Sequence, residues 1–290
     1  MRGVENPQGF GRINADMNII ETRDLTHVYR GKIKALDGVN FAAKPGERIA
    51  IIGANGAGKS TLFKHFNGIL KPTSGEVMIK GEPVSKKNIL DVRRTVGVVF
   101  QDPDDQIFAP TVKQDVSFGP MNLGLPPDVI EKRVHEALEL VRLNGFEERA
   151  PHHMSTGEKK KVAIAGILAM QPEVLVLDEP TAGLDPGGAL RLIRLINDMN
   201  RYLGITIITA THEVDIVPLL ADRVCIMSGG RIIGDGSPQE IFSTDELIKK
   251  THLRLPIVAQ LLELLQEKGV PVNVKFTLEE ARDELLRVVK

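Results

Sequence analysis

The stretch Gly53-Ala-Asn-Gly-Ala-Gly-Lys-Ser60 follows the apolar run Arg48–Ile52 and precedes a helical pattern over Lys59–Phe66. Its glycines allow the backbone to curl, so that successive amide N–H groups and the N-terminus of the following helix surround a phosphate group. Lys59 supplies a positive charge for the outer phosphates of a nucleoside triphosphate, and the Ser60 hydroxyl can reach Mg²⁺. Strand, glycine-rich turn and helix in this order predict a phosphate-binding P-loop.

A second apolar run, residues 174–177, ends in the acidic pair Asp178-Glu179. A parallel strand delivers the residues at its carboxyl end to the ligand crevice, so Asp178 can hold Mg²⁺ through water and Glu179 can polarise an attacking water. Alone, such a pair is weak evidence, because acidic residues after a strand commonly cap the next turn. Beside a P-loop, the pair favours nucleotide hydrolysis.

Short apolar runs elsewhere outline the rest of a sheet. They span residues 19–22, 36–42, 77–80, 96–100 and 205–210. Runs that are apolar on both faces and separated by helical patterns indicate a parallel sheet between helices, while glycine-rich turns at 44–47 and 228–231 suggest antiparallel additions. The sequence predicts an α/β fold with a mixed central sheet.

The strand pattern lapses over about residues 102–170, where apolar residues recur at helical spacing after Pro126-Pro127. We expect an inserted helical subdomain there. Residues 1–16 are polar and are expected to form a disordered extension, so the predicted nucleotide-binding domain spans 17–244. Residues 245–290 carry two amphipathic patterns, the second opened by a capping box from Thr277 to Glu280, and predict a C-terminal helical extension.

Composition excludes several classes of protein. The 290 residues carry 37 Lys and Arg against 38 Asp and Glu, a formal charge of −1 that gives no reason to expect a nucleic-acid partner. A single cysteine, Cys225, rules out a disulfide within the chain. No run approaches the length of a membrane span, and the N-terminus lacks an apolar signal segment, so a cytosolic location is expected.

Further motifs give the chain a family resemblance. The segment Met154-Ser-Thr-Gly-Glu158 resembles the signature motif of ABC ATPases, and Thr181-Ala-Gly-Leu-Asp185 resembles their D-loop. Gln101 matches the Q-loop, His212 the switch histidine, and Tyr29 the aromatic residue on which adenine stacks. The resemblance covers residues 17 to about 240 and implies an ABC ATPase fold that uses ATP and Mg²⁺.

The resemblance also assigns roles to residues. It implies nucleotide contacts from Tyr29, Gly53, Asn55, Gly56, Ala57, Gly58, Lys59, Ser60 and Thr61, catalysis by Glu179, His212 and Gln101, metal binding by Ser60, Gln101 and Asp178, and a D-loop contact from Asp185. Signature residues Ser155, Thr156, Gly157 and Glu158 would act on the ATP of a second ATPase subunit, either an identical copy or a paralogue. Thr156 stands where the family usually has glycine, so we expect slower closure of the dimer.

Residues 100–124 are similar to the Q-loop region of energy-coupling factor transporters, which import cobalt, nickel or vitamins. This likeness implies a peripheral subunit at the cytoplasmic face of the membrane, with a membrane-embedded coupling subunit and a substrate-binding membrane subunit as partners. The cobalt and nickel members resemble the chain most, and a vitamin or another ABC importer is the alternative. A soluble ABC protein of repair or translation is disfavoured by the single cassette, and a small-molecule kinase by the signature.

Other features have plainer interpretations. His152-His153 lacks a third ligand at metal-binding spacing, and the Lys159–Lys161 run is typical of a solvated helix face. In the tail, residues 257, 261, 264 and 265 form one expected apolar stripe and residues 278, 281, 285 and 288 another. We expect these stripes to join two subunits, the alternative being that they pack on their own ATPase core.

Overall fold

A computed structural model of the chain describes residues 17–244, 247 and 254–289, so the extension expected at 1–16 lies outside the described residues. The strands are β1 (Ile20–Tyr29), β2 (Ile33–Ala43), β3 (Arg48–Ile52), β4 (Ser74–Ile79), β5 (Glu82–Pro83), β6 (Val96–Val99), β7 (Val174–Asp178), β8 (Thr206–Thr211), β9 (Arg223–Ser228) and β10 (Arg231–Gly236). The α-helices are α1 (Lys59–Phe66), α2 (Ile89–Thr95), α3 (Val112–Asn122), α4 (Pro127–Leu140), α5 (Thr156–Leu168), α6 (Pro186–Leu203), α7 (Val217–Leu220), α8 (Pro238–Phe242), α10 (Ile257–Glu267) and α11 (Leu278–Val289). Short 3₁₀ turns occupy Pro103–Asp105, Pro151–His153 and Val214–Ile216.

The central sheet has the strand order β10-β9-β3-β8-β7-β6. Strands β9, β3, β8, β7 and β6 are parallel to their neighbours, while β10 returns antiparallel to β9. The mixed sheet predicted from the sequence is therefore confirmed. Because β3, β7 and β8 run in the same direction, the P-loop, the acidic pair and His212 emerge at one edge of the sheet.

A second, antiparallel sheet has the order β2-β1-β4-β5. Strand β1 extends well beyond the run expected at 19–22, and β2 begins before the run expected at 36–42. The pairing of β1 with β2 shifts register between Thr22 and Leu25, and Asp24 has a φ of 46°. This irregularity interrupts the alternation of apolar and polar residues, so the sequence pattern does not predict the second half of β1.

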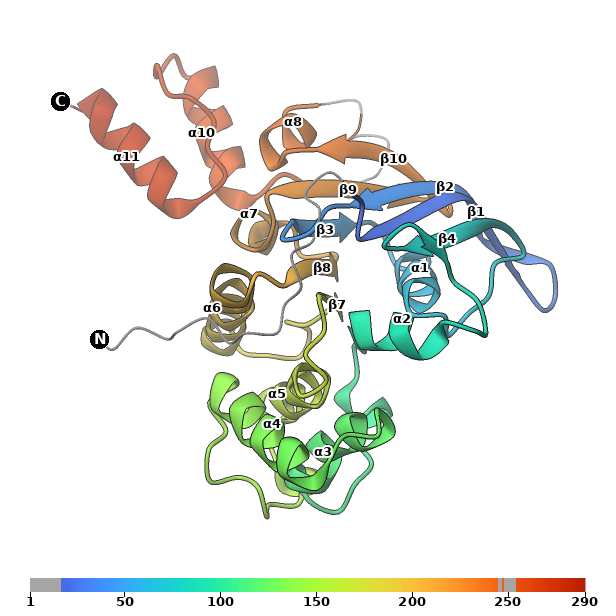
Figure 1. Cartoon of the computed structure of the whole chain (residues 1–290). Coiled ribbons are helices and arrows are strands. Elements are labelled where there is room, and N and C mark those ends of the chain that lie inside the picture. The colour runs from blue at the N-terminus through green and yellow to red at the C-terminus, as the bar shows by residue number, and fades with distance from the viewer. Residues whose placement is uncertain (1–16, 245–246, 248–253, 290) are drawn as a thin grey trace.

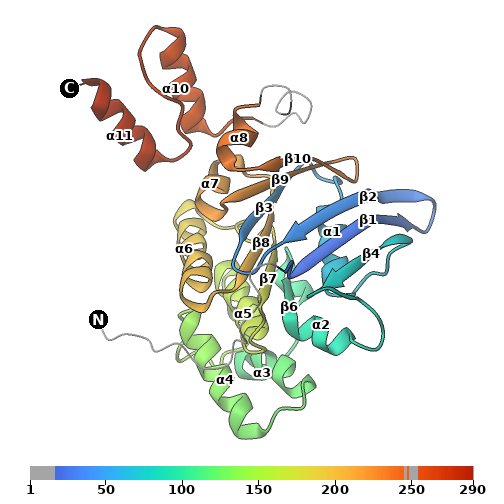
Figure 2. The same cartoon turned by 45° about the horizontal axis from the view of Figure 1, so that its top comes forward.

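Both faces of the central sheet are covered. Figures 1 and 2 show α6 and α7 on one side, with α1 and the antiparallel sheet on the other. Strand β7 shows how the sequence achieves this: Val174 and Val176 pack into the cluster that includes α1, whereas Leu175 and Leu177 pack with α5 and α6. All four are fully buried, as a strand alternating its side chains between two covered faces requires.

Helices α3, α4 and α5 form a group beside the β6 and β7 edge (Figure 1). Helix α4 begins with Pro127 in its first turn and buries Val134, Ala137 and Leu138. These side chains share one apolar cluster with α5 and α6. The inserted helical subdomain of the expected fold is present, and it packs on the sheet through α5.

The tail helices α10 and α11 project past α8 at the end away from α3 and α4 (Figure 1). Ala259 and Phe276 join the core cluster of the ATPase domain, and the Phe276 ring lies 5.7 Å from that of Phe242. The expected α10 stripe is wrong in detail, because Leu265 packs toward α11 while Ile257, Leu261 and Leu264 are exposed. The tail thus docks on its own core and still presents a second apolar face. None of the described helices is long and apolar enough to cross a bilayer.

Candidate nucleotide-binding site

The P-loop requires glycine at two positions. A Cβ atom on Gly53 would lie 2.2 Å from the carbonyl oxygen of Met227, and one on Gly58 would lie 2.6 Å from the carbonyl oxygen of Ala35. Gly58 also has a φ of 107°, a region that side chains disfavour. The loop therefore passes so close to two neighbouring backbones that a side chain at either glycine would clash.

Lys59 and Ser60 begin α1 and face the carboxyl end of β7. The Lys59 side chain is buried, and its Nζ donates to the carbonyl oxygens of Gly53 at 2.7 Å and Ala54 at 3.2 Å. Burial raises the pKa of Asp178, and a hydrogen bond from Ser60 opposes that rise. A cation, a hydroxyl and a carboxylate are thus held together at the loop.

Glu179 is 4% exposed and has a φ of 47°, an unusual conformation for a residue other than glycine. Its Oε1 accepts from Nδ1 of His212 at 2.9 Å and lies 4.0 Å from Nζ of Lys59. Its Oε2 is buried and has no hydrogen-bond partner among the described residues. Strained backbone and an unsatisfied carboxylate oxygen both occur commonly at functional sites.

Most of the predicted site residues line two adjoining cavities. The smaller, of about 420 Å³, is lined by Tyr29, Ile33, Lys34, Ala35, Asn55, Gly56, Ala57, Gly58, Lys59, Ser60, Thr61, Gln101, Asp178 and Glu179. Tyr29 lies at its rim, half-exposed, with its hydroxyl 3.2 Å from Oγ1 of Thr61. An aromatic ring at the mouth and a cation at the base suit a nucleotide with its base outward.

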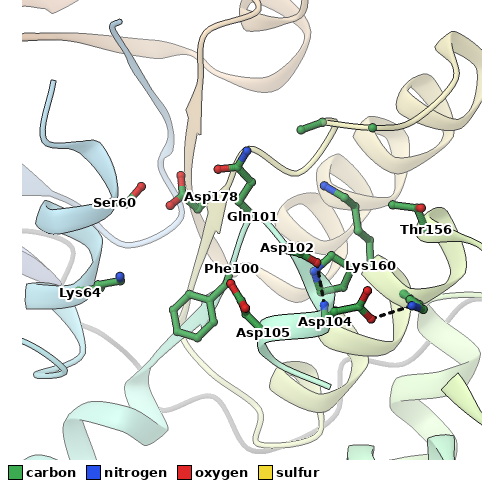
Figure 3. Close-up of a pocket in the computed structure, with 14 residues that line it drawn as sticks. Ser60, Lys64, Phe100, Gln101, Asp102, Asp104, Asp105, Thr156, Lys160 and Asp178 are labelled. Atoms are coloured by element: carbon green, nitrogen blue, oxygen red, sulfur yellow. Dashed lines mark hydrogen bonds and ion pairs between the residues drawn. The ribbon is translucent and has the colours of Figure 1, made fainter. Parts of the chain in front are cut away.

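The larger cavity, of about 940 Å³, shares Ser60, Gln101 and Asp178 with the smaller. Figure 3 shows Ser60 and Asp178 on one side of it and Thr156 on the other, with Gln101 between them. The described residues contain no cluster of three or more His, Cys, Asp or Glu suited to a metal ion. One carboxylate, one hydroxyl and one amide still fit Mg²⁺, which keeps several waters and takes phosphate oxygens as its other ligands.

Three of the four signature residues 155–158 line neither cavity of their own chain. Ser155 caps α5, and its side chain accepts from the amide of Glu158 at 3.3 Å while Oε2 of Glu158 accepts from the Ser155 amide at 2.9 Å. This backbone bond holds the pKa of Glu158 below its usual value. Of the signature residues, Thr156 lines the larger cavity, whereas Ser155, Gly157 and Glu158 line neither.

Asp185 has a structural role that the sequence analysis did not assign. It caps α6, and its Oδ1 accepts from the amide of Gly188 at 2.9 Å. This bond lowers the pKa of Asp185. Any contact of Asp185 with a second subunit would use a carboxylate that is already fixed in place.

One interpretation from the sequence is corrected by the structure. Lys160 is 3% exposed, so the Lys159–Lys161 run is not a uniformly solvated face. His65 is also buried, with Nε2 3.2 Å from Nδ1 of His27, whose ring packs against Tyr29. No spacing in the sequence predicts the burial of Lys160 or the contact between His65 and His27. The Ser155-to-Glu158 capping box, in contrast, is a known pattern that could have been found from the sequence.

The fold and site define the class of protein, and comparison with known proteins agrees. Residues 36–182 match the ABC transporter family. The chain is 57% identical over 277 residues to the energy-coupling factor transporter ATP-binding protein EcfA of Methanocaldococcus jannaschii, covering 94% of this chain and 99% of that one. A putative ABC transporter ATP-binding protein of Methanosarcina mazei is 58% identical over 276 residues, which are 95% of this chain and 84% of its relative.

Solved structures give the same result. CbiO1 of Clostridium perfringens, part of the ABC transporter complex cbiONQ, superposes with a TM-score of 0.74 and 49% identity over 86% of this chain and all of that one. A dimeric ATP-binding cassette with ADP and Pi superposes with a TM-score of 0.69 at 27% identity, over 76% of this chain and 98% of that one. The chain is therefore an ATP-hydrolysing ABC ATPase. Within that class it belongs to the energy-coupling factor transporter ATP-binding proteins.

Proposed function

We propose that the chain binds MgATP in the two joined cavities and hydrolyses it as one of a pair of ATPase subunits that drive a membrane importer. Lys59 and the loop amides bind the phosphates, Tyr29 stacks on adenine, and Ser60, Gln101 and Asp178 hold the metal ion. When bound, Mg²⁺ neutralises charge on the transferred phosphate. The observation that carries this proposal is the meeting of Lys59, Ser60, Asp178 and Glu179 at one cavity.

Glu179 is proposed as the general base. Its carboxylate sits beside the phosphate-binding lysine, and Oε2 is free to accept a proton from an attacking water while His212 holds Oε1. The hydrogen bond to His212 fixes the direction of the carboxylate. Proton transfer from water to Glu179 makes the nucleophile that attacks the outer phosphate. The bond from that phosphate to the bridging oxygen of ADP breaks, and ADP and inorganic phosphate leave.

A second subunit is proposed to complete the site. Ser155 and Gly157 lie at the N-terminal end of α5, where the helix dipole favours an anion and the capping box bonds the amides of Ser155 and Glu158 but not that of Gly157. Because neither residue lines the cavity of its own chain, the phosphate they serve is assigned to a partner. The resemblance to a dimeric cassette supports this arrangement.

Trapping tests the composite site. The test uses Glu179→Gln protein that also carries Leu261→Glu and Leu264→Glu, which remove an exposed apolar face of the tail through which two chains could already associate. This protein should be a monomer alone and sediment as a dimer with MgATP, because the nucleotide stays intact between the two faces. Adding Gly157→Asp, which places a negative charge against the partner's phosphate, should restore the monomer. A Glu179→Gln chain that remains monomeric at saturating MgATP contradicts the composite site.

A groove beside the Q-loop is proposed to receive the membrane-embedded coupling subunit. It holds about 510 Å³ and is lined by Leu90, Phe108 and Phe118, all large and exposed apolar residues. Gln106 also lines it, and its Oε1 accepts from the amide of Phe100, next to Gln101. A helix seated in the groove would therefore press on the segment that carries a proposed metal ligand.

Loss of co-purification tests the groove. Phe108→Ser should abolish recovery of the chain with a multispanning membrane partner while leaving MgATP affinity unchanged. Tyr202→Ser is the matched control, because Tyr202 and Phe108 are both 66% exposed and Tyr202 lies on α6. Equal recovery of both variants contradicts the assignment of the groove.

The tail is proposed to hold two subunits together between ATP cycles. Ile257, Leu261 and Leu264 form an exposed apolar face on α10 that a second copy can cover. Removing the whole tail would uncover Phe242, so a surface variant is the better test. Leu261→Glu with Leu264→Glu should turn a nucleotide-free dimer into a folded monomer, whereas Leu140→Glu on α4 should not. Unchanged mass contradicts the proposal.

Cobalt or nickel is proposed as the cargo, from the similarity of residues 100–124 to the metal-importing members. Specificity would reside in a separate membrane subunit, and the ATPase would stay peripheral at the cytoplasmic face. The test is accumulation of radioactive Co²⁺ and Ni²⁺ by cells that express the full transporter. Uptake of a vitamin with no metal uptake would overturn this choice.

A further inference from the structure

Lys160 is a buried cation on α5, the helix that begins in the signature segment, and it has no part in the hydrolysis mechanism proposed for Glu179. Its Nζ donates to the carbonyl oxygen of Glu179 at 3.0 Å. Burial lowers the pKa of Lys160, while the nearby carboxylates of Glu179, Asp102 and Glu213 oppose that change. Figure 3 places Lys160 between Thr156 and Gln101, at the larger cavity. A buried charge in this position links α5 to the backbone of the proposed base.

The first turn of α5 also packs on the chain just after Glu179. A Cβ atom on Gly183 would lie 3.8 Å from Cγ2 of Thr156, and one on Gly157 would lie 3.4 Å from Cδ2 of Leu184. These close approaches place the signature segment beside residues 179–184 of the same chain. A displacement of α5 would therefore reach the Glu179 peptide through the hydrogen bond from Lys160.

The peptide of Glu179 is held from three directions. Its amide donates to the carbonyl oxygen of Ala210 at 3.0 Å, and its carbonyl oxygen accepts from the amide of Ala182 at 3.2 Å and from Lys160. Because the residue has a φ of 47°, its backbone needs this support to keep its strained conformation. The bond from Lys160 is the one that comes from the signature helix.

We propose that Lys160 is a positioning residue that couples the two ATP sites of a dimer. The inference rests on the proposed function, since coupling requires each signature segment to contact nucleotide bound by the partner. When Ser155 and Gly157 engage the partner's phosphate, α5 shifts and Lys160 carries that shift to the Glu179 peptide of its own chain. Each site then becomes competent only when the other is closed, and the two hydrolyse cooperatively.

Kinetics of three variants test the coupling. Lys160→Met keeps the length of the side chain without its charge, Lys160→Gln keeps a hydrogen-bond donor, and Lys161→Met is the control at the next position. Lys160→Met should lower kcat by about 10- to 100-fold, the scale expected for a misplaced catalytic group. Its MgATP affinity should stay unchanged and its Hill coefficient should fall to one. Lys160→Gln should recover part of both losses.

Hydrogen exchange gives a readout that does not depend on turnover. In a Glu179→Gln background that also carries Leu261→Glu and Leu264→Glu, the dimer trapped by MgATP should protect amides of residues 179–184. Lys160→Met should reduce that protection while the dimer persists. Kinetics and protection that match the Lys161→Met control overturn the inference. If that background forms no dimer with MgATP, the composite site fails, and the inference fails with it. If Lys160→Met does not fold, Lys160→Gln decides by the same measurements.

Discussion

Replacing Glu179 with glutamine should slow ATP hydrolysis without weakening ATP binding. Glutamine has the same shape, and its amide oxygen can still accept from Nδ1 of His212, 2.9 Å from the present Oε1. The substitution therefore leaves the direction of the side chain intact and removes its charge and its basicity. Loss of a positioned general base typically costs about 10²- to 10⁴-fold in rate, or about 2.7 to 5.4 kcal/mol in the barrier.

The structure also fixes the sign of the effect on binding. The Glu179 carboxylate lies 4.0 Å from Nζ of Lys59 and so competes with phosphate for that cation. Neutralising it should leave MgATP affinity equal or higher. Steady-state phosphate release gives the rate, and calorimetry gives the affinity.

The matched control is Glu173→Gln, which neutralises a carboxylate just before the opposite end of β7, where Glu173 pairs with Lys80. It should hydrolyse ATP at the wild-type rate. Turnover of Glu179→Gln within a few-fold of wild type, in protein that binds MgATP normally, would remove Glu179 from the role of base.

Three further outcomes are expected. Lys59→Ala should weaken MgATP binding by about 10- to 100-fold in calorimetry, because hydrogen bonds to charged phosphates are lost, while Lys132→Ala on α4 should not. Burial holds the pKa of His65 below its usual 6.5, so the folded chain stays neutral there while the unfolded chain gains a proton. The stability of the folded chain should therefore fall as pH drops below about 6.5. In thermal melts, His65→Gln should weaken this dependence of melting temperature on pH, whereas the exposed His135→Gln should leave it unchanged. Lys160→Met should melt at the same temperature as wild type or higher, and a lower melting temperature with intact turnover would make Lys160 a structural residue.

Much of the site could be predicted because its motifs depend on local chain order. The P-loop, the acidic pair and His212 each follow a buried parallel strand, and parallel strands that share a direction bring such residues to one edge. Gly53 and Gly58 were also predictable as glycine positions, although the backbones they approach, at Met227 and Ala35, come from distant segments.

The rest depended on tertiary contacts that no period in the sequence records. Lys160 sits in a run of three lysines, and its burial follows from the packing of α5 on residues 179–184. In the tail, apolar residues occupy more than one face of α10, so helical spacing alone could not show that Leu262 faces inward and Leu261 outward. When a second surface of a helix is also apolar, the spacing of its apolar residues does not show which surface faces the core.

The energetics of Lys160 explain why a charge is placed there at all. Taking an ammonium group out of water costs several kcal/mol, and apolar residues of similar volume often replace buried charges with no loss of stability. The carbonyl oxygen of Glu179 is a single neutral acceptor, and the surrounding carboxylates compensate only in part, since the pKa of Lys160 remains lowered. Packing alone would favour methionine at this position. This lysine is costly for folding, yet it bonds to the peptide of the proposed base, so its effect on Glu179 best explains its presence. Lys160→Met should therefore lower turnover without lowering stability.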